Sequence, residues 1–275
     1  MEGTAASVSS GDRSFTGEIM IKHVVVTGAA SGIGADCCRA LLDQGWKVYG
    51  LDRSEEGLLE LERYQENTSG EFIPLRCDVS DSAAMAHAFA QIGQMTPSLD
   101  ALICSAGIFR TGPLLEMSEE NFDALFEINT KGAWLAAREA FPLLKRDAPG
   151  SEPTHMVFVA SIAALRPKVG GGAYAASKVA LTQLVRVMAV ELAGHGILVN
   201  AVAPSTVDTP MTQKLAADAA HNGYKVSGMS PIGRVAQPAD ITSVIRFLLS
   251  ADARYVNGAI LPVDGGTSAA FQPTV

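Results

Sequence analysis

The sequence predicts an α/β fold of three layers, in which a doubly wound parallel sheet of seven strands lies between two layers of helices. Short apolar runs alternate with longer amphipathic segments along most of the 275 residues, and a glycine-rich turn follows the first run. Such alternation is typical of parallel strands joined by helices. A chain of this length can bury one large core. We therefore expect residues 20–275 to form a single domain and the Ser-, Gly- and Thr-containing residues 1–19 to be a disordered extension.

Each expected strand is a short run rich in Val, Ile, Leu and Ala, which is typical of strands buried on both faces. In chain order the runs are Ile21–Thr27, Trp46–Leu51, Phe72–Arg76, Leu99–Cys104, His155–Ala160, Ile197–Ala203 and Ala259–Val263. Helical periodicity predicts helices over Asp36–Gln44, Glu55–Gln65, Glu119–Lys145, Ala173–Gly194 and Gln237–Leu249, and another that begins near Asp81. The looser pattern of Gln213–Val235 suggests a mobile lid.

Charge and cysteine usage exclude several kinds of partner. The net charge of −8 argues against a nucleic-acid partner, which would require a basic surface. No apolar run reaches the roughly 20 residues of a membrane-spanning helix, and no basic amphipathic helix favours a membrane surface. The cysteines at positions 37, 38, 77 and 104 lack metal-ligand spacing, so we expect small buried residues in a reduced, cytoplasmic protein. No metal site is expected.

The glycine-rich turn is the first candidate binding site. Gly28, Gly32 and Gly34 permit a tight turn and bring the N-terminus of the next helix close to an anion such as pyrophosphate. A glycine cluster alone is equally consistent with an ordinary turn. Asp52, after the second strand, is placed to bind the ribose hydroxyls of NAD and to repel the additional phosphate of NADP. Arg53 favours that phosphate, so NAD is the expected cofactor and NADP the alternative.

Three further features point to the same crevice. Asp78 follows the third strand and is expected to accept a hydrogen bond from an adenine amino group, because Asp81 is better placed to cap the next helix. The turn Ser105–Gly107 allows the chain to pass closely over a ligand. Asn129 lies among apolar neighbours in a helix, where its amide either holds a water that passes protons from Lys178 or has a structural role.

The main chemical signal is the segment that contains Ser161, Tyr174 and Lys178. In a helix Tyr174 and Lys178 share one face, about one turn apart. An ammonium held near a phenol favours the phenolate, which makes the tyrosine a usable acid or base. Ser161, after the fifth strand, offers a hydroxyl to a substrate oxygen. Each residue alone is also ordinary on a solvated surface, so the case depends on the rest of the chain.

From about Ile21 to Ser268 the sequence resembles the short-chain dehydrogenase/reductase family, whose members have a single Rossmann-type domain. The family's T-G-x-x-x-G-I-G motif corresponds to Thr27–Gly34 and its D-V pair to Asp78–Val79. Its helical Asn, its catalytic Ser and its Y-x-x-x-K motif correspond to Asn129, Ser161, Tyr174 and Lys178. Joint occurrence in this order is far more specific than any one motif.

The resemblance implies a mechanism and a cofactor site. Ser161 would hold the substrate oxygen, and Tyr174 would exchange its proton. Lys178 would bind the nicotinamide ribose and lower the pKa of the tyrosine, while Asn129 would anchor a proton-relay water. The residues implied to contact the dinucleotide are Gly28, Ser31, Gly32, Ile33, Gly34, Asp52, Arg53, Cys77, Asp78, Val79, Cys104, Ala106, Gly107, Tyr174, Lys178, Pro204, Val207 and Thr209.

Two positions depart from the family pattern. Cys104 replaces the first asparagine of the family's N-N-A-G motif, and it cannot make the hydrogen bonds with which that asparagine braces the sheet. We therefore expect altered local geometry at this loop. Ser205 replaces the glycine that usually follows Pro204, which predicts a slight shift of the loop that holds the nicotinamide.

The substrate is less well determined than the chemistry. Arg110, Arg166 and Lys168 lie on loops expected to rim the crevice, where a guanidinium can bind a carboxylate, although solvated loop charge is the alternative for each. Local similarity extends to the branch that oxidises dihydrodiol carboxylates such as 2,3-dihydro-2,3-dihydroxybenzoate, and to the 3-oxoacyl thioester reductases that use NADPH. We expect hydride transfer between NAD(H) and a secondary alcohol or ketone. Our substrate hypothesis is an anionic hydroxy compound or cyclic dihydrodiol, contacted by Ser161, Arg110 and Arg166.

A rival interpretation is a catalytically silent protein that binds the dinucleotide as a sensor. The presence of all four family catalytic residues argues against it. Members of the family usually form tetramers or dimers, and the helix Ala173–Gly194 is apolar nearly all round, which suggests a subunit interface. We therefore expect a homotetramer or homodimer that acts on a small molecule.

Overall fold

The computed structural model describes residues 21–146, 148, 150–222 and 228–269, and the strands within these ranges form one sheet. They are β1 (His23–Thr27), β2 (Lys47–Asp52), β3 (Glu71–Arg76), β4 (Ala101–Cys104), β5 (Thr154–Val159), β6 (Ile197–Pro204) and β7 (Ile260–Val263). Their order is β3-β2-β1-β4-β5-β6-β7, and all neighbouring strands are parallel. The predicted fold class is confirmed, and the direction of winding reverses between β1 and β4, where such folds bind ligands.

Helices connect the strands on both faces of the sheet. They are α1 (Gly32–Leu42), α2 (Glu55–Gln65), α3 (Ser82–Met95), α4 (Glu119–Phe126), α5 (Ala133–Leu144), α6 (Gly172–Glu191), α7 (Pro210–Asn222) and α8 (Pro238–Leu248), with a π-helical turn η2 (Glu127–Gly132) between α4 and α5. Asp81 caps α3 by accepting hydrogen bonds from the backbone N–H groups of Ala83 and Ala84, as expected. None of the helices in the described ranges is long and apolar enough to cross a membrane.

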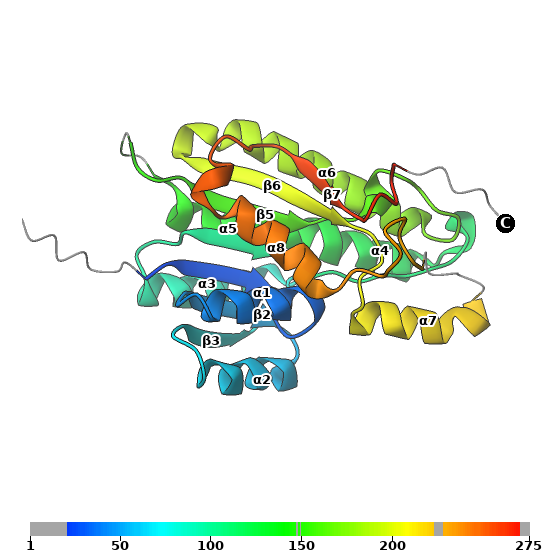
Figure 1. Ribbon diagram of the computed structural model, residues 1–275, viewed down its shortest axis with the longest axis horizontal. Coiled ribbons are helices and arrows are strands. Elements are labelled where there is room, and N and C mark those ends of the chain that lie inside the picture. The colour runs from blue at the N-terminus through cyan, green and yellow to red at the C-terminus, as the bar shows by residue number, and fades with distance from the viewer. Residues whose placement is uncertain (1–20, 147, 149, 223–227, 270–275) are drawn as a thin grey trace, which may run out of the picture.

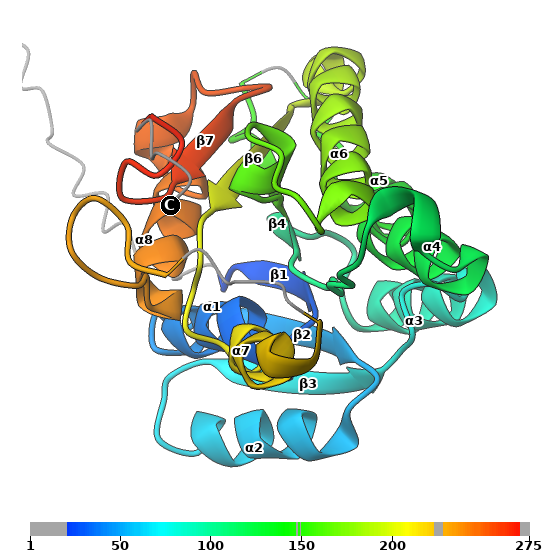
Figure 2. The same cartoon turned by 90° about the vertical axis from the view of Figure 1, so that its right-hand side faces the viewer.

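Alternate side chains of the strands build two cores, one on each face of the sheet. In β1, Val25 belongs to one core and Val24 and Val26 to the other, and all three are fully buried. The first core lies between the sheet and α3, α5 and α6, and the second lies between the sheet and α1, α2 and α8 (Figures 1 and 2). Burial on both faces explains why the central strands are continuous apolar runs rather than alternating ones.

The helix expected over Asp36–Gln44 begins earlier, at Gly32, and two other expected helices differ more. The continuous helix expected over Glu119–Lys145 is interrupted by η2, in which each turn contains one residue more than a turn of α-helix. The wider turn lets the side chain of Asn129 bind both the loop after β4 and α6. The helix expected to reach Gly194 ends at Glu191, and a short 3-10 turn follows it up to Gly196, whose φ of +70° ends the segment.

The first part of the expected lid is helical. α7 covers Pro210–Asn222 although the apolar pattern there is weak, since proline suits the first position of a helix and alanine has the highest helix propensity. Residues 223–227 and the extension 1–19 lie outside the described residues, so mobility of the lid and disorder of the extension stay predictions. Figure 2 looks onto the carboxyl edge of the sheet and shows α7 in front of it.

Candidate active site

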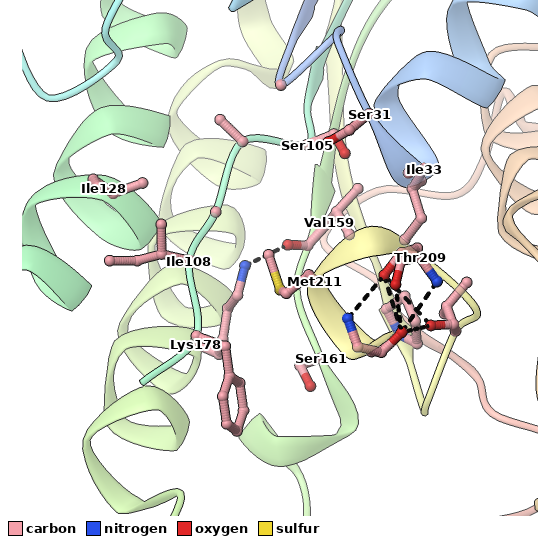
Figure 3. Close-up of a pocket in the computed structure, with 18 of the residues that line it drawn as sticks. Ser31, Ile33, Ser105, Ile108, Ile128, Val159, Ser161, Lys178, Thr209 and Met211 are labelled. Atoms are coloured by element: carbon pink, nitrogen blue, oxygen red, sulfur yellow. Dashed lines mark hydrogen bonds between the residues drawn. The ribbon is translucent and has the colours of Figure 1, made fainter. Parts of the chain in front are cut away.

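One pocket runs along the carboxyl ends of the strands β1 to β6, with the first turn of α7 on one side (Figure 3). Most of the predicted site residues line it: Gly28, Ser31, Gly32, Ile33, Asp52, Arg53, Cys77, Asp78, Val79, Ala106, Gly107, Ser161, Arg166, Tyr174, Lys178, Pro204, Val207 and Thr209. Gly34, Cys104, Arg110 and Asn129 are not among the lining residues. Parallel strands end at one edge, which is why residues so distant in sequence meet here.

The turn after β1 passes very close to other backbone segments, which explains its glycines. Gly28 has a φ of +69°, and a Cβ there would lie 2.6 Å from the backbone N of Ala106. A Cβ on Gly34 would collide with the carbonyl O of Gly28. Ser31 begins α1 without a side-chain cap, so the first N–H groups of the helix have no helical partner. This close-packed turn fits the pyrophosphate of a dinucleotide.

Two carboxylates lie at the end of the pocket near β2 and β3, and hydrogen bonds fix both. Asp52 accepts from the backbone N–H of Ala30 at 3.1 Å and from that of Ser54 at 2.9 Å. Asp78 accepts from the backbone N–H and the hydroxyl of Ser80 at 2.9 and 2.7 Å, and this hydroxyl holds the pKa of Asp78 below its usual value. This end of the pocket is therefore negative and suited to hydroxyl and amino donors.

Lys178 is a buried cation inside the pocket. The residue is 4% exposed, and its Nζ donates to the carbonyl O of Val159 at 2.8 Å, as Figure 3 shows. Burial lowers the pKa of Lys178 to about 8, so the ammonium predominates at pH 7 by roughly tenfold. Its Nζ lies 5.9 Å from the centroid of the Tyr174 ring. The structure thus brings the phenol and the ammonium together, as their spacing predicted.

Tyr174 and Ser161 complete the predicted catalytic group. The ring of Tyr174 packs against that of Phe109, with centroids 4.3 Å apart. The Oγ of Ser161 accepts a hydrogen bond from the N–H of Ala163 at 3.1 Å, which caps the short 3-10 turn after β5 and leaves the hydroxyl proton available to a substrate oxygen. Figure 3 shows Ser161 and Lys178 directed into the same pocket. The capping and substrate-binding roles of Ser161 are therefore compatible.

The side chain of Asn129 binds two other segments of the chain. The residue is 1% exposed, and its Nδ2 donates to the carbonyl O of Ile108 at 3.0 Å and to the hydroxyl of Ser177 at 3.1 Å. Its Oδ1 accepts the N–H of Ile108 at 2.8 Å. Both N–H donors are engaged by protein groups, whereas Oδ1 accepts one hydrogen bond and can accept a second, so the relay-water role stays a prediction beside the structural one. The amide anchors the loop after β4, and a catalytic role for Asn129 stays a prediction.

Cys104 faces the core rather than the pocket. It is 3% exposed, and its Sγ lies 3.9 Å from the carbonyl O of Ala133. Its contact with the dinucleotide stays a prediction. Thr27 binds the residues that follow Cys104. Its carbonyl O accepts the N–H of Ser105 at 3.2 Å, and its hydroxyl accepts that of Ala106 at 3.4 Å. The loop after β4 is therefore held to β1.

Two of the three predicted rim cations line the pocket. Arg166 donates through Nη1 to the carbonyl O of Thr267 at 2.8 Å. Lys168 lies on the same loop, and burial lowers the pKa of its ammonium. Arg110 does not line the pocket, and its exposed side chain donates through Nη1 to the carbonyl O of Phe109 at 3.0 Å, so its substrate contact stays a prediction.

Sequence reasoning missed the apolar side of the pocket. The residues concerned are Ile108, Phe109, Ile128, Met211 and Leu215. Met211 and Leu215 are four residues apart, so their common face could be recognised only once α7 was known to be helical. Figure 3 shows Met211 projecting into the middle of the pocket. In the described part of the chain, no three His, Cys, Asp or Glu side chains are grouped so as to hold a metal ion.

Comparisons with known proteins agree with this geometry. A family model described as enoyl-(acyl carrier protein) reductase matches residues 28–268. The 3-oxoacyl-[acyl-carrier-protein] reductase of Thermotoga maritima is 34% identical over 245 residues, which cover 89% of this chain and 97% of that protein. The 2,3-dihydro-2,3-dihydroxybenzoate dehydrogenase of Escherichia coli K12 is 33% identical over 254 residues, with 90% and 97% covered. The crystal structure of levodione reductase has a TM-score of 0.83 at 30% identity, with 91% and 98% covered.

The fold, the pocket and these relatives define an oxidoreductase that uses a nicotinamide dinucleotide. The chain belongs to the short-chain dehydrogenase/reductase family. It acts on CH–OH groups and interconverts secondary alcohols and ketones. The predicted similarity to dihydrodiol dehydrogenases and to 3-oxoacyl reductases is confirmed.

Proposed function

We propose that the protein exchanges hydride between NAD(H) and the secondary alcohol or ketone of an anionic hydroxy compound or cyclic dihydrodiol. The observation that carries the proposal is the buried Lys178 ammonium beside the Tyr174 ring in a pocket that also contains Ser161. Ser161 donates a hydrogen bond to the substrate oxygen, and Tyr174 exchanges the proton of that oxygen. The positive charge of Lys178 favours the phenolate form of the tyrosine. These residues thereby handle the proton while the nicotinamide carries the hydride.

NAD is the cofactor that the pocket supports best. The turn at Gly28 and Gly34 leaves no space for a Cβ, and it lies at the N-terminus of α1, where pyrophosphate fits. Backbone N–H groups hold both carboxylate oxygens of Asp52 at the end of β2. In this position the negative carboxylate can accept hydrogen bonds from ribose hydroxyls and would repel a 2′-phosphate. Arg53 also lines the pocket and favours NADP, which makes NADP the alternative.

The charge distribution of the pocket supports an anionic substrate. In the described part of the chain, the acids that line the pocket are Asp52 and Asp78, both at its cofactor end. Arg166 and Lys168 lie on the segment that joins the two residues expected to contact the reacting oxygen. A carboxylate in this region would meet positive charge, while the apolar side chains would contact a carbon ring.

A 3-oxoacyl thioester is the second candidate substrate, with NADPH as the reductant. Two observations favour it, namely the relative from Thermotoga maritima and the presence of Arg53 in the pocket. We further propose that the protein is cytoplasmic, because all four cysteines are free and buried. A homotetramer or homodimer is also part of the proposal.

The test is a substrate panel read by the appearance or disappearance of reduced nicotinamide. It pairs cyclic secondary alcohols with their carboxylate derivatives, adds a 3-oxoacyl thioester, and runs each with NAD(H) and NADP(H). We expect the highest kcat/KM with NAD and a carboxylate. Tyr174→Phe should lower kcat by about a hundredfold or more while NAD still binds, because only the proton transfer is lost.

Other outcomes would change the conclusion. A preference for the thioester with NADPH would establish the second candidate. Binding of NAD without turnover of any compound by the unmodified protein, with unchanged binding by Tyr174→Phe, would favour the dinucleotide sensor. Calorimetric titration with NAD and NADP provides the binding measurement independently of the substrate.

A further inference from the structure

A buried polar cluster joins the helix that carries Tyr174 to two other segments of the chain. Its centre is Ser177, which is fully buried and does not line the pocket. The Oγ of Ser177 accepts a hydrogen bond from Nδ2 of Asn129 at 3.1 Å and donates one to the carbonyl O of Tyr174 at 2.8 Å. A buried hydroxyl that both accepts and donates has a fixed orientation. The cluster therefore has one preferred geometry.

The carbonyl group that receives this hydroxyl has a special place in α6. In an α-helix the carbonyl of residue i accepts the N–H of residue i+4, so the carbonyl of Tyr174 is the acceptor for the backbone of Lys178. The hydroxyl of Ser177 thus binds the same carbonyl O through which the backbones of Tyr174 and Lys178 are hydrogen-bonded. A serine that bonds back to a helix carbonyl also changes the local bend of the helix.

The π-helical turn η2 holds the same serine at a second point. Thr130, the residue after Asn129, donates through Oγ1 to the carbonyl O of Ser177 at 2.9 Å. Two consecutive residues of η2 therefore bind the side chain and the backbone of one residue of α6. π turns are rare and often occur at functional sites, because they place side chains that a regular helix would direct elsewhere.

The other end of the cluster reaches the loop after β4. Asn129 makes two hydrogen bonds to the backbone of Ile108, at 2.8 and 3.0 Å. Ile108 lines the pocket, and the ring of the next residue, Phe109, packs on the ring of Tyr174. The loop beside the substrate position and the turn that carries Tyr174 are therefore linked through Asn129 and Ser177.

We propose that Ser177 is a positioning residue, whose hydroxyl holds the turn with Tyr174 and Lys178 in register with η2 and the loop after β4. The proposal rests on the proposed function, since it concerns the geometry of the same phenol and ammonium. Ser177 itself touches neither substrate nor cofactor. Its role is to keep the separation of the two catalytic groups constant, and a misplacement of about 1 Å can reduce turnover by as much as a hundredfold.

The chain offers a matched control on the same helix. Thr182 is buried, and its Oγ1 donates to the carbonyl O of Val179, three residues earlier, at 2.8 Å, which is the same type of bond as that of Ser177. We therefore compare Ser177→Ala with Thr182→Val. We expect Ser177→Ala to lower kcat by about tenfold or more with little change in the KM for NAD, and Thr182→Val to leave kcat unchanged.

A second measurement, the pKa of the Tyr174 phenol, reports the position of the tyrosine relative to Lys178 without requiring turnover. The near-ultraviolet absorbance of phenolate, recorded against pH as the difference from Tyr174→Phe in the same background, gives the midpoint of the Tyr174 titration. We expect a higher midpoint in Ser177→Ala and no change in Thr182→Val, because a loosened turn weakens the attraction between phenolate and ammonium. If the unmodified protein oxidises none of the alcohols, the proposed function fails and this titration alone decides the positioning role.

The proposal is overturned if Ser177→Ala keeps both the kcat and the titration midpoint of the unmodified protein. It is also overturned if Thr182→Val changes them as much, since the effect would then be general to α6. Should Ser177→Ala fail to fold, Ser177→Cys provides the test, because a thiol makes weaker hydrogen bonds to Asn129 and to the carbonyl O of Tyr174. We expect the same direction of change in Ser177→Cys, and no change would reject the proposal.

Discussion

The burial of Lys178 shows how chemistry limits stability at the scale of one residue. An ammonium taken out of water is unfavourable, which is the reason that the pKa of Lys178 falls to about 8. One hydrogen bond to the carbonyl O of Val159 compensates only in part. A buried apolar residue at this position would suit the core better. The loss of stability caused by burying the ammonium is explained if this charge is needed beside Tyr174. Groups that destabilise a protein are concentrated at functional sites.

The first prediction at this scale concerns Arg166. If the substrate is an anion, Arg166→Ala should raise the KM for a carboxylate substrate by about tenfold and change the KM for a neutral analogue little, because a charge-assisted hydrogen bond to a carboxylate contributes roughly 1.5 to 3 kcal/mol. The measurement is the ratio of kcat/KM for a cyclic alcohol and for its carboxylate derivative, in the variant and in the unmodified protein.

Arg110→Ala is the matched control for Arg166. Both residues are arginines on loops at the carboxyl edge, but Arg110 is exposed and does not line the pocket. We expect Arg110→Ala to leave unchanged the ratio of kcat/KM for the cyclic alcohol and for its carboxylate derivative. An equal loss of discrimination in both variants would indicate a general surface potential, and no loss in Arg166→Ala would remove this arginine from substrate recognition.

Individual site residues were predictable to the extent that their roles depend on local spacing. The four-residue interval between Tyr174 and Lys178 places both on one helix face whatever surrounds them. The partners of Asn129 are 21 and 48 positions distant in sequence, so no local pattern reveals them. Arg110 is a different case, because its side chain bonds the carbonyl O of the adjacent Phe109, and its direction depends on a side-chain rotamer that no sequence pattern fixes.

At the scale of elements, the interruption of α4 and α5 by η2 is the main difference from prediction. Apolar residues recur at helical spacing on both sides of η2, so the sequence reads as one helix. The unfavourable geometry of the π turn is compensated by the hydrogen bonds that Asn129 and Thr130 make to α6 and to the loop after β4. These partners belong to other elements, and such a distortion therefore becomes visible only in three dimensions.

The second prediction concerns β5 and the pH dependence of stability. His155 is 8% exposed near the start of β5, and its Nδ1 has no hydrogen-bond partner. Burial, followed by the charge of Lys22, lowers the pKa of His155 from 6.5 to about 4. Below pH 6.5 His155 becomes protonated in the unfolded chain, whereas in the folded chain it stays neutral until about pH 4. The free energy of unfolding should therefore fall by about 3 kcal/mol between these values.

Chemical denaturation at several pH values measures this effect. His155→Leu should keep its stability over the window from pH 6.5 to 4 better than the unmodified protein, because it has no group to protonate. His87→Leu is the control, since His87 is exposed on α3. If the two variants follow the same pH profile as the unmodified protein, the loss of stability in acid arises elsewhere.

At the scale of the whole molecule, the helices on one face of the sheet expose a group of large apolar side chains. On the face of α4, α5 and α6, the exposed apolar residues are Phe122, Trp134, Val179, Val187 and Val190. The three valines follow one another on one side of α6, at intervals of eight and three residues. An apolar surface of this kind usually marks a protein interface. The helices involved are those that carry Tyr174 and adjoin η2, so an interface here would support the site from outside.

The third prediction follows from this surface. The unmodified protein should be a dimer or tetramer by light scattering, and Val179→Glu combined with Val187→Glu should yield a smaller species, because two buried charges without partners would disfavour association. Circular dichroism checks that the variant remains folded. We also expect its kcat to fall, since the turn of Tyr174 and η2 would lose the support of the neighbouring subunit.

Leu59→Glu separates an interface effect from a general effect of charge. Leu59 is 48% exposed, as Val179 is, but it lies on α2, which covers the other face of the sheet. We expect this variant to keep the association state and the activity of the unmodified protein. A monomeric unmodified protein would show that the exposed valines of α6 serve no subunit contact, and the catalytic turn would then be held only by contacts within one subunit, such as the bonds of Ser177 and the packing of Phe109 on Tyr174.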